Sequence, residues 1–474
     1  DGKGLGLTAP RKEGQKRALE RAYWQAGVLP GAVGLVEAHG TGTVVGDRTE
    51  LQTLTEIFNA GGALPFSAGL GSVKSQIGHT KCAAGIAGFI KVAKALYHQV
   101  LPPTIGIEKP NAGYDADHSP FRLNAAAIPW PQKQAYAAVS AFGFGGTNFH
   151  AVLSSWRADG QAAHSGSGVV RWAAELFLFR GETFDVVARR MQAFARFLRE
   201  SDALLPLRDL AWTISSQGSG QVQCAIVAKD VSELVFRLEC AHLREKQEGV
   251  HYRQHEMPGK LAFVFPGQGS QSPGMLQDVF VTFPALQEIL EQGLPWMDKM
   301  FPPTAYSREE QQRQQQAITD TRVAQPTLGM ADYAMATLLQ SLGIRPDMLA
   351  GHSYGELVAL AVARGYDLPA LLHLSERRGC AILDAAGDDP GRMAAVSAGR
   401  ETLEALFPPG AGSGVVLANQ NSPAQTVISG STRAVDAALV MLKERGIAAR
   451  PIEVACAFHS PVVARAEKVF ADVL

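Results

Sequence analysis

The stretch that most constrains this fold is Gly-His-Ser-Tyr-Gly at residues 351–355, which follows apolar residues 349–350 and precedes an amphipathic segment. This order predicts a short strand, a sharp turn and a helix. Glycines on both sides of Ser353 let the backbone bend and remove the neighbouring side chains, so the hydroxyl stands at the mouth of a sheet. Amides at the start of the helix can hold an oxyanion there. Since the chain contains 48 glycines, the motif can arise by chance, and its strand and helix context makes Ser353 a candidate nucleophile.

Length and composition bound the remaining possibilities. A chain of 474 residues with 46% hydrophobic and 19% charged residues predicts two or three globular domains. The formal net charge of -1 gives no excess of positive charge for binding nucleic acid or an anionic membrane. Five cysteines without a C-x-x-C pair indicate reduced thiols in the cytoplasm, with no disulfide frame and no metal site. No apolar run is long enough to span a bilayer, and the start, which lacks Met and a signal segment, indicates the middle of a larger protein.

Residues 1–154 predict alternating α and β structure with glycine-rich turns. Helices are expected at 13–26 and 82–97, and strands at 34–38, from residue 71 and at 137–140. His39 and His79 each follow a predicted strand. A single histidine in such a place is usually a structural residue, but two of them at equivalent junctions are candidates for a shared site.

Three motifs in this region carry a family resemblance. They are His-Gly-Thr-Gly-Thr at 39–43, Lys-x-x-x-Gly-His-Thr at 74–80 and Phe-Gly-Phe-Gly-Gly-Thr-Asn at 142–148. Together they resemble the C-terminal half of a β-ketoacyl synthase, which has a thiolase-like fold. The resemblance implies that this half is incomplete and inactive alone, because the nucleophilic cysteine of the family precedes residue 1 and Cys82 does not match its motif. It also implies that two imidazoles support decarboxylative condensation beside a lysine, and that two threonines contact a phosphopantetheine arm; these residues are His39, His79, Lys74, Thr41 and Thr43.

Residues 155–258 predict a linker followed by a small domain. Ser, Gly and Ala dominate 155–170, as in flexible linkers. Strands are expected at 175–180 and 221–229 and amphipathic helices at 185–200 and 231–244, which gives a small α/β spacer domain. No acid, base or nucleophile clusters there, so we interpret it as structural.

Residues 259–474 contain the Ser353 motif together with further motifs before and after it. An apolar strand at 261–265 enters Pro-Gly-Gln-Gly-Ser-Gln, and a helix is expected at 368–386. Arg378 lies on the apolar stripe of that helix, whereas Arg377 points elsewhere. A buried guanidinium needs a partner, which is either a structural acid or a carboxylate that arrives with the substrate.

A compact α+β insert is predicted at about 391–454, followed by Cys-Ala-Phe-His at 456–459. With Pro-Gly-Gln-Gly-Ser at 266–270, Gly-His-Ser-Tyr-Gly-Glu at 351–356 and Arg-Gly at 378–379, this order resembles a malonyl-type acyltransferase. The family has an α/β-hydrolase-like large subdomain and a ferredoxin-like small subdomain, here without its usual C-terminal end. The resemblance implies a nucleophile, its base and two oxyanion donors, one of them a backbone amide: Ser353, His459, Gln268 and Tyr354. It places the malonyl carboxylate on Arg378 and the substrate pocket beside His352, Phe458 and Cys456, where Cys456 replaces the more usual histidine.

The domains follow one another as a synthase half at 1–154, a spacer at 155–258 and an acyltransferase at 259–474. This order resembles a type I polyketide synthase, and the sequences of its motifs are similar to those of iterative enediyne and polyunsaturated fatty acid synthases. This implies malonyl-CoA as substrate, a carrier-protein phosphopantetheine as acceptor, no tightly bound cofactor and a homodimeric full-length protein that includes the rest of the synthase and downstream domains.

Three other interpretations remain open. One is an iterative fatty acid synthase module, which has the same architecture. A serine α/β-hydrolase or thioesterase has the same nucleophile motif, but requires an acid between Ser353 and His459, such as Asp367, Asp388 or Glu404. A non-catalytic docking platform would not acylate Ser353 at all.

Overall fold

The computed structural model describes residues 6, 9–132, 135–156, 172–201, 205–253, 259–408, 410, 412–452 and 454–473. It divides into two compact units: Asp1–Gly168 together with Leu261–Leu474, and Val169–Lys260. Most of the predicted linker at 155–170 lies outside the described residues. No helix among the described residues is both long and apolar enough to cross a membrane.

The N-terminal part of the first unit is built on a five-stranded sheet with the order β4-β2-β1-β6-β7. Its strands are β1 (Val33–Glu37), β2 (Ala68–Gly71), β4 (Phe121–Arg122), β6 (Tyr136–Gly143) and β7 (Thr147–Ser154). Strand β1 is parallel to β2 and β6, and only β7 is antiparallel to its neighbour. A second, antiparallel pair is formed by β3 (Val100–Leu101) and β5 (Ile128–Pro129).

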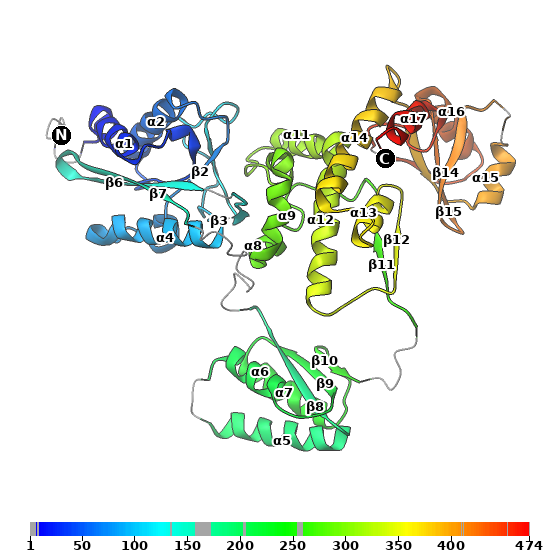
Figure 1. Ribbon diagram of the computed structural model, residues 1–474, viewed down its shortest axis with the longest axis horizontal. Coiled ribbons are helices and arrows are strands. Elements are labelled where there is room, and N and C mark those ends of the chain that lie inside the picture. Colours follow the sequence, from blue (N-terminus) through cyan, green and yellow to red (C-terminus); the bar gives the residue numbers. More distant parts are fainter. Residues whose placement is uncertain are drawn as a thin grey trace. The chain divides into compact units, whose positions relative to one another are not determined.

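Helices cover both faces of this sheet (Figure 1). They are α1 (Lys12–Ala26), α2 (Val44–Ala60), α3 (Lys74–Ile77) and α4 (Ala84–His98), with short 3-10 turns η1 (Pro30–Ala32), η2 (Lys81–Ala83) and η3 (Phe144–Gly146). All five residues of β1 are buried, as expected for a central parallel strand with helices on both sides. Val36 packs with α1 and α2, whereas Leu35 packs with Val92 of α4.

Two elements differ from the sequence-based expectation in this region. Helix α2 was not predicted, although Leu51, Leu54 and Phe58 have helical spacing and are buried. The strand expected from residue 71 onward ends at Gly71 in the structure, and Lys74 begins a helical turn. The backbone turns there because buried Glu37 accepts a hydrogen bond from the backbone N–H of Val73 at 2.6 Å.

The second unit is a three-stranded antiparallel sheet, β10-β9-β8, with helices packed against it. Its elements are β8 (Glu175–Gly181), α5 (Phe184–Glu200), α6 (Leu207–Ser216), β9 (Gln221–Ala228), α7 (Val231–His242) and β10 (Val250–Tyr252). Buried residues of α5, α7 and β9 form its separate core.

The C-terminal part of the first unit has a large helical subdomain around the parallel pair β11 (Ala262–Phe265) and β12 (Met348–Gly351). Its helices are α8 (Gln277–Thr282), α9 (Gln287–Gln292), α10 (Met297–Met300), α11 (Arg308–Thr319), α12 (Thr321–Ser341), α13 (Gly355–Val362) and α14 (Leu368–Ala386), with turns η4 (Pro284–Leu286) and η5 (Leu294–Trp296). Buried residues of α12, α13 and α14 pack together, so the turn after β12 is held by rigid neighbours.

The predicted insert is a four-stranded antiparallel sheet with the order β14-β15-β13-β16. In chain order it contains β13 (Arg392–Val396), α15 (Arg400–Leu406), β14 (Val415–Ser422), β15 (Gln425–Gly430), α16 (Thr432–Glu444) and β16 (Ala449–Ile452). This βαββαβ sequence with the first and third strands in the centre is the ferredoxin-like arrangement. The turn η6 (Pro461–Val463) and α17 (Arg465–Ala471) follow.

Candidate active site

Ser353 occupies a strained turn between β12 and α13. Its φ is +52°, a left-handed conformation that a residue with a side chain rarely adopts. The flanking glycines are required by space: a Cβ on Gly351 would lie 2.1 Å from the backbone nitrogen of Glu356, and one on Gly355 would lie 2.2 Å from the carbonyl oxygen of Phe265. The G-x-S-x-G pattern therefore lets the turn pack directly against β11 while it presents the serine side chain.

His459 is brought to Ser353 from a position 106 residues further along the chain. Its Nε2 lies 2.8 Å from the serine Oγ, within hydrogen-bond distance. His459 also has a left-handed φ of +56°, and the Oγ of Ser429 donates to the carbonyl of the preceding Phe458 at 2.7 Å. Partial burial, followed by the positive charge of Arg378, lowers the pKa of His459 and so favours the neutral imidazole that can accept a proton.

No acid orients this imidazole within the described part of the chain. Asp367 instead caps α14, because its carboxylate accepts from the backbone N–H of Ala370 at 3.0 Å. Glu404 pairs with Arg400 at 2.6 Å, and Asp388 is exposed without a hydrogen bond to His459. The acid that a serine hydrolase triad requires is therefore not formed by any of the three candidates.

The backbone N–H groups of Gln268 and Tyr354 are among those at the site that have no acceptor among the described residues. The side chain of Gln268 points to α12, where its Nε2 donates to Thr321 Oγ1 at 3.2 Å. The side chain of Tyr354 is fully buried. Both residues line the pocket, so it is their backbone amides that are suited to receive an oxyanion.

Arg378 also faces this pocket, and it has no ion pair or hydrogen bond to any residue that the structure describes. Burial lowers its pKa, while Tyr354, Glu356 and Cys456 act in the opposite direction. Of the two partners that the sequence allowed, a structural acid at ion-pair distance is thus not found among the described residues, although Glu356 is near enough to act on Arg378 through its charge. Arg377, the next residue, is exposed, as its position on the helix predicted.

The pocket has a volume of about 190 Å³ and lies between the large subdomain and the insert. Its walls include several predicted residues, His352, Phe458 and those discussed above. Cys456 is fully buried next to them, and burial raises the pKa of its thiol to about 12. Sequence reasoning missed Asn419 of β14, which also lines the pocket and whose Nδ2 lies 3.0 Å from His352 Nε2. An asparagine near the end of a predicted strand carried no signal of this contact.

The predicted synthase histidines also come together. The rings of His39 and His79 have centroids 5.9 Å apart and are nearly perpendicular. Nδ1 of His79 accepts a hydrogen bond from the backbone of Lys81 at 3.0 Å, so the neutral ring carries its proton on Nε2. Burial, with the charge of Lys74, lowers the pKa of His39 to about 4. Two neutral imidazoles side by side can donate N–H groups to one developing anion.

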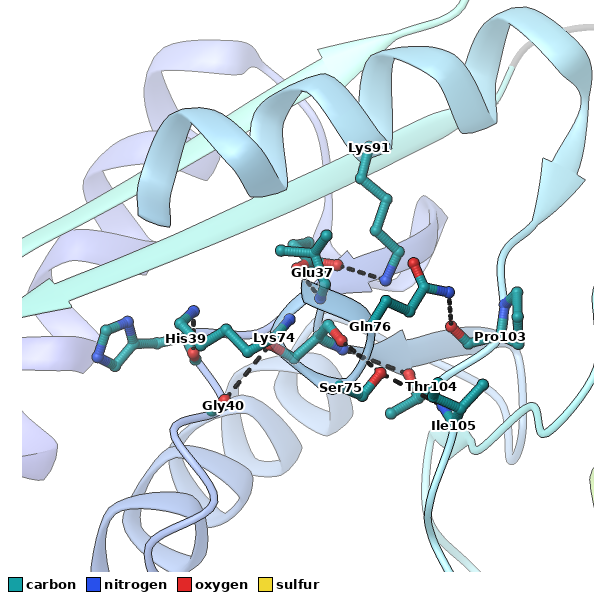
Figure 2. A network of polar contacts seen from close by, with 12 residues as sticks. Glu37, His39, Gly40, Lys74, Ser75, Gln76, Lys91, Pro103, Thr104 and Ile105 are labelled. Carbon is teal, nitrogen blue, oxygen red and sulfur yellow. Dashed lines mark hydrogen bonds and ion pairs between the residues drawn. The ribbon is translucent and has the colours of Figure 1, made fainter. Parts of the chain in front are cut away.

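A polar network holds the loop that carries His39 (Figure 2). Nζ of Lys74 donates to the backbone carbonyl of His39, and Glu50 accepts from the backbone N–H groups of His39 and Gly40 at 2.7 and 2.9 Å. Burial raises the pKa of Glu50 to about 7. Lys91 reaches from α4 to the buried carboxylate of Glu37 at 2.8 Å. Lys74 therefore hydrogen-bonds to the backbone of the loop, and it acts on the His39 ring only through its charge.

Thr41 and Thr43 lie on the same loop as His39, with their hydroxyl oxygens 3.1 Å apart. Cys82 is exposed in the turn after His79. Nothing in the geometry assigns the two threonines a ligand.

Three family models match the chain in order. Residues 1–108 match the β-ketoacyl synthase C-terminal domain, residues 110–219 the ketoacyl-synthetase C-terminal extension, and residues 262–474 the acyl transferase domain. Over 520 aligned residues the chain is 32% identical to a polyunsaturated fatty acid synthase polypeptide of Thraustochytrium sp., and over 478 it is 34% identical to polyketide synthase GfsE of Streptomyces halstedii. The chain belongs to the type I polyketide synthase family. This confirms the family resemblance of the motifs.

These two matches cover 100% and 98% of this chain, but only 18% and 12% of the length of the two relatives. Its fold is similar to the acyl transferase domain of ZmaA (TM-score 0.53, 22% identity, 64% of this chain and 69% of that one). It is also similar to that of SpnD in complex with a substituted malonyl group (TM-score 0.51, 24% identity, 66% and 71%). These likenesses confirm the α/β multidomain fold class, and residues 262–474 make the chain a transferase.

Proposed function

We propose that this segment loads malonyl from malonyl-CoA onto Ser353 and passes it to the phosphopantetheine thiol of an acyl carrier protein. The observation that carries the proposal is the 2.8 Å contact between Ser353 and His459 in a pocket that also holds the unpaired Arg378. A hydroxyl needs an adjacent base to attack a thioester, and a guanidinium fork suits a carboxylate.

The reaction follows from the positions of these groups. His459 Nε2 takes the hydroxyl proton as Ser353 Oγ bonds to the thioester carbonyl carbon, and the backbone N–H groups of Gln268 and Tyr354 stabilise the oxyanion. Collapse breaks the carbon–sulfur bond, and the imidazolium returns its proton to the leaving CoA thiolate. The carrier-protein thiol then attacks the acyl-serine ester by the same steps in reverse order, a ping-pong transfer.

Substrate choice depends on Arg378 in this proposal. A malonyl carboxylate pairs with the guanidinium, whereas an acetyl group leaves it unpaired in a partly buried site. Phe458 and His352 line the same pocket, and we propose that Phe458 limits the space beside the acyl chain, with the fully buried Cys456 two residues before it in the chain. This set supports malonyl as the extender unit.

For the N-terminal part we propose a contribution to a condensing site. His39 and His79 would stabilise the enolate left when malonyl loses carbon dioxide, Lys74 would fix their loop, and Thr41 and Thr43 would contact the phosphopantetheine arm. The nucleophilic thiol would come from the remaining part of the synthase domain. In this proposal the synthase part spans residues 1–154, the spacer domain 155–258 and the acyltransferase 259–474.

The larger protein is proposed to be a cytoplasmic homodimer of the iterative enediyne or polyunsaturated fatty acid synthase type, with carrier and further domains on the same polypeptide. The match to a polyunsaturated fatty acid synthase supports that narrower assignment. We also propose that the larger protein makes a product of this class, such as an antibiotic.

Incubation with malonyl-CoA, with and without a phosphopantetheinylated carrier protein, tests the acyltransferase proposal. We expect malonyl-carrier protein to form much faster than free malonate. Equal or faster release of malonate, independent of the carrier protein, would instead identify a hydrolase.

A further inference from the structure

A pair of side chains joins the insert to the large subdomain at the edge of the acyl pocket. Nδ2 of Asn419, on β14 of the insert, lies 3.0 Å from Nε2 of His352, the residue before the candidate nucleophile. Both residues line the pocket. Because they come from its two walls, their contact closes the pocket at this point, next to any acyl group that Ser353 carries.

The backbone of β14 directs Asn419 into the pocket. Asn419 pairs with Val427 of β15, and residues directly opposite in an antiparallel pair face the same side of the sheet. Val427 also lines the pocket. The register of the two strands shifts immediately before Asn419, after Leu417, and again after Gln420. Since such irregularities re-aim side chains next to active sites, the local shape of β14 supports a specific role for this asparagine.

The loop after β11 holds the His352 ring at its other nitrogen. A Cβ on Gly267 would lie 2.8 Å from Nδ1 of His352 and 2.9 Å from its carbonyl oxygen, so only glycine leaves room for this residue. The backbone N–H of His352 also donates to the carbonyl of Phe265 at 2.9 Å. The ring therefore has no space to withdraw toward the loop, and the pocket can widen here only if the bond to Asn419 breaks.

This contact opens more easily than the buried parts of the pocket wall. His352 is exposed and Asn419 is half-buried, whereas Tyr354 and Val427 of the same pocket are buried. A hydrogen bond between neutral groups that water can reach contributes little net stability, because water replaces either partner when the bond breaks. A bulky acyl group can therefore gain space here at the cost of one hydrogen bond, without displacing packed helices or strands.

We propose that Asn419 is a specificity-determining residue, whose hydrogen bond to His352 bounds the space for the acyl group and disfavours malonyl groups with an alkyl substituent on the central carbon. An unsubstituted malonyl group is seated with the bond intact, whereas a 2-alkylmalonyl group must break it. The inference rests on the proposed function and deepens it, because it adds a limit on acyl size to the selection of charge by Arg378.

Asn419→Ala in the full chain tests the proposal. Ethylmalonyl-CoA and malonyl-CoA compete for transfer to a carrier protein, and the products give the ratio of kcat/KM for ethylmalonyl to that for malonyl. We expect this ratio to rise about fivefold, which corresponds to about 1 kcal/mol for the loss of one hydrogen bond. Asn419→Asp keeps the shape of the side chain and can accept from the other tautomer of the imidazole, so its ratio should stay near the wild-type value.

Asn421→Ala is the matched control, because Asn421 also lines the pocket from β14 but its Nδ2 donates to Gln425 within the insert, at 3.1 Å. Its ratio should equal that of the wild type. An unchanged ratio in Asn419→Ala, or an equal rise in Asn421→Ala or Asn419→Asp, overturns the size limit, while transfer of malonyl by the wild type leaves the proposed function standing. If the wild type transfers no malonyl group, the proposed function fails as well.

Discussion

If Arg378 binds the malonyl carboxylate as proposed, its replacement by alanine should leave a transferase that hardly distinguishes malonyl from acetyl. In the structure the guanidinium is partly buried, lines the pocket and makes no ion pair with an acid among the described residues, although the charge of Glu356 acts on it. A bound malonyl group would supply that partner, whereas an acetyl group has no charge to offer. The change therefore acts on one substrate and not on the other.

The size of the effect follows from the cost of leaving a charge unpaired. Removing one partner of a buried ion pair costs about 3–5 kcal/mol, and the pocket is open enough to water that we use the lower end. About 3 kcal/mol corresponds to a fall of roughly 150-fold in kcat/KM for malonyl-CoA, since 1.4 kcal/mol is tenfold. For acetyl-CoA we expect a change of less than about fivefold.

Steady-state transfer from each acyl-CoA to a carrier protein measures both values. Arg378→Lys, which keeps the charge but loses the planar fork, should fall between wild type and Arg378→Ala. Arg377→Ala removes the neighbouring exposed arginine from the same helix and should leave the ratio unchanged. Equal losses for malonyl and acetyl, or the same result for Arg377→Ala, would refute the carboxylate clamp.

Three further predictions concern the base, the core and the turn. Because the charge of Arg378 helps to lower the pKa of His459, the rate of Ser353 acylation by acetyl-CoA should rise with pH through a midpoint below 6.5, and Arg378→Ala should move that midpoint upward; a midpoint that does not move contradicts the electrostatic coupling. Burial raises the pKa of Asp332 from 3.8 to about 7, so the folded state is penalised as pH rises from about 4 to about 7, by up to about 4 kcal/mol at 1.36 kcal/mol per unit. Asp332→Asn should therefore stabilise the protein against denaturant at pH 8 but not at pH 4, and an equal effect at both values would show that Asp332 ionises normally. Gly355→Ala should lower the free energy of unfolding by at least about 2 kcal/mol and abolish loading, since its Cβ would overlap the Phe265 carbonyl; unchanged melting and loading would contradict the packing of the turn.

The sequence predicted those parts of the fold that depend on local patterns. The turn at Ser353, the helix of Arg378 and the ferredoxin-like insert have clear periodicity and glycine signals, and the structure contains all three. Helix α2 was not predicted, although Leu51, Leu54 and Phe58 have helical spacing, because it follows a glycine- and threonine-rich loop and its start has no side-chain cap. The strand at Gly71 was extended too far, since its end depends on Glu37, a residue 36 positions away from its partner Val73.

Contacts between distant residues were beyond sequence reasoning in the candidate site. Asn419 reaches His352 only because the insert sheet is placed over the pocket, and the Tyr354–Ser375 contact depends on how α12, α13 and α14 pack. The partner of Arg378 was left open by the sequence for the same reason. Geometry also distinguished the Gln268 side chain, which donates to Thr321 of α12, from its backbone amide, which has no acceptor among the described residues.

The central claim is that Ser353 becomes acylated with the help of His459. Intact-mass measurement of the chain after brief exposure to malonyl-CoA, with peptide mapping of the modified residue, tests it most directly. We predict one malonyl adduct on Ser353 in the wild type, none in Ser353→Ala, and a much slower appearance in His459→Ala. An adduct that persists in Ser353→Ala, or that forms at the same rate without His459, would contradict the account.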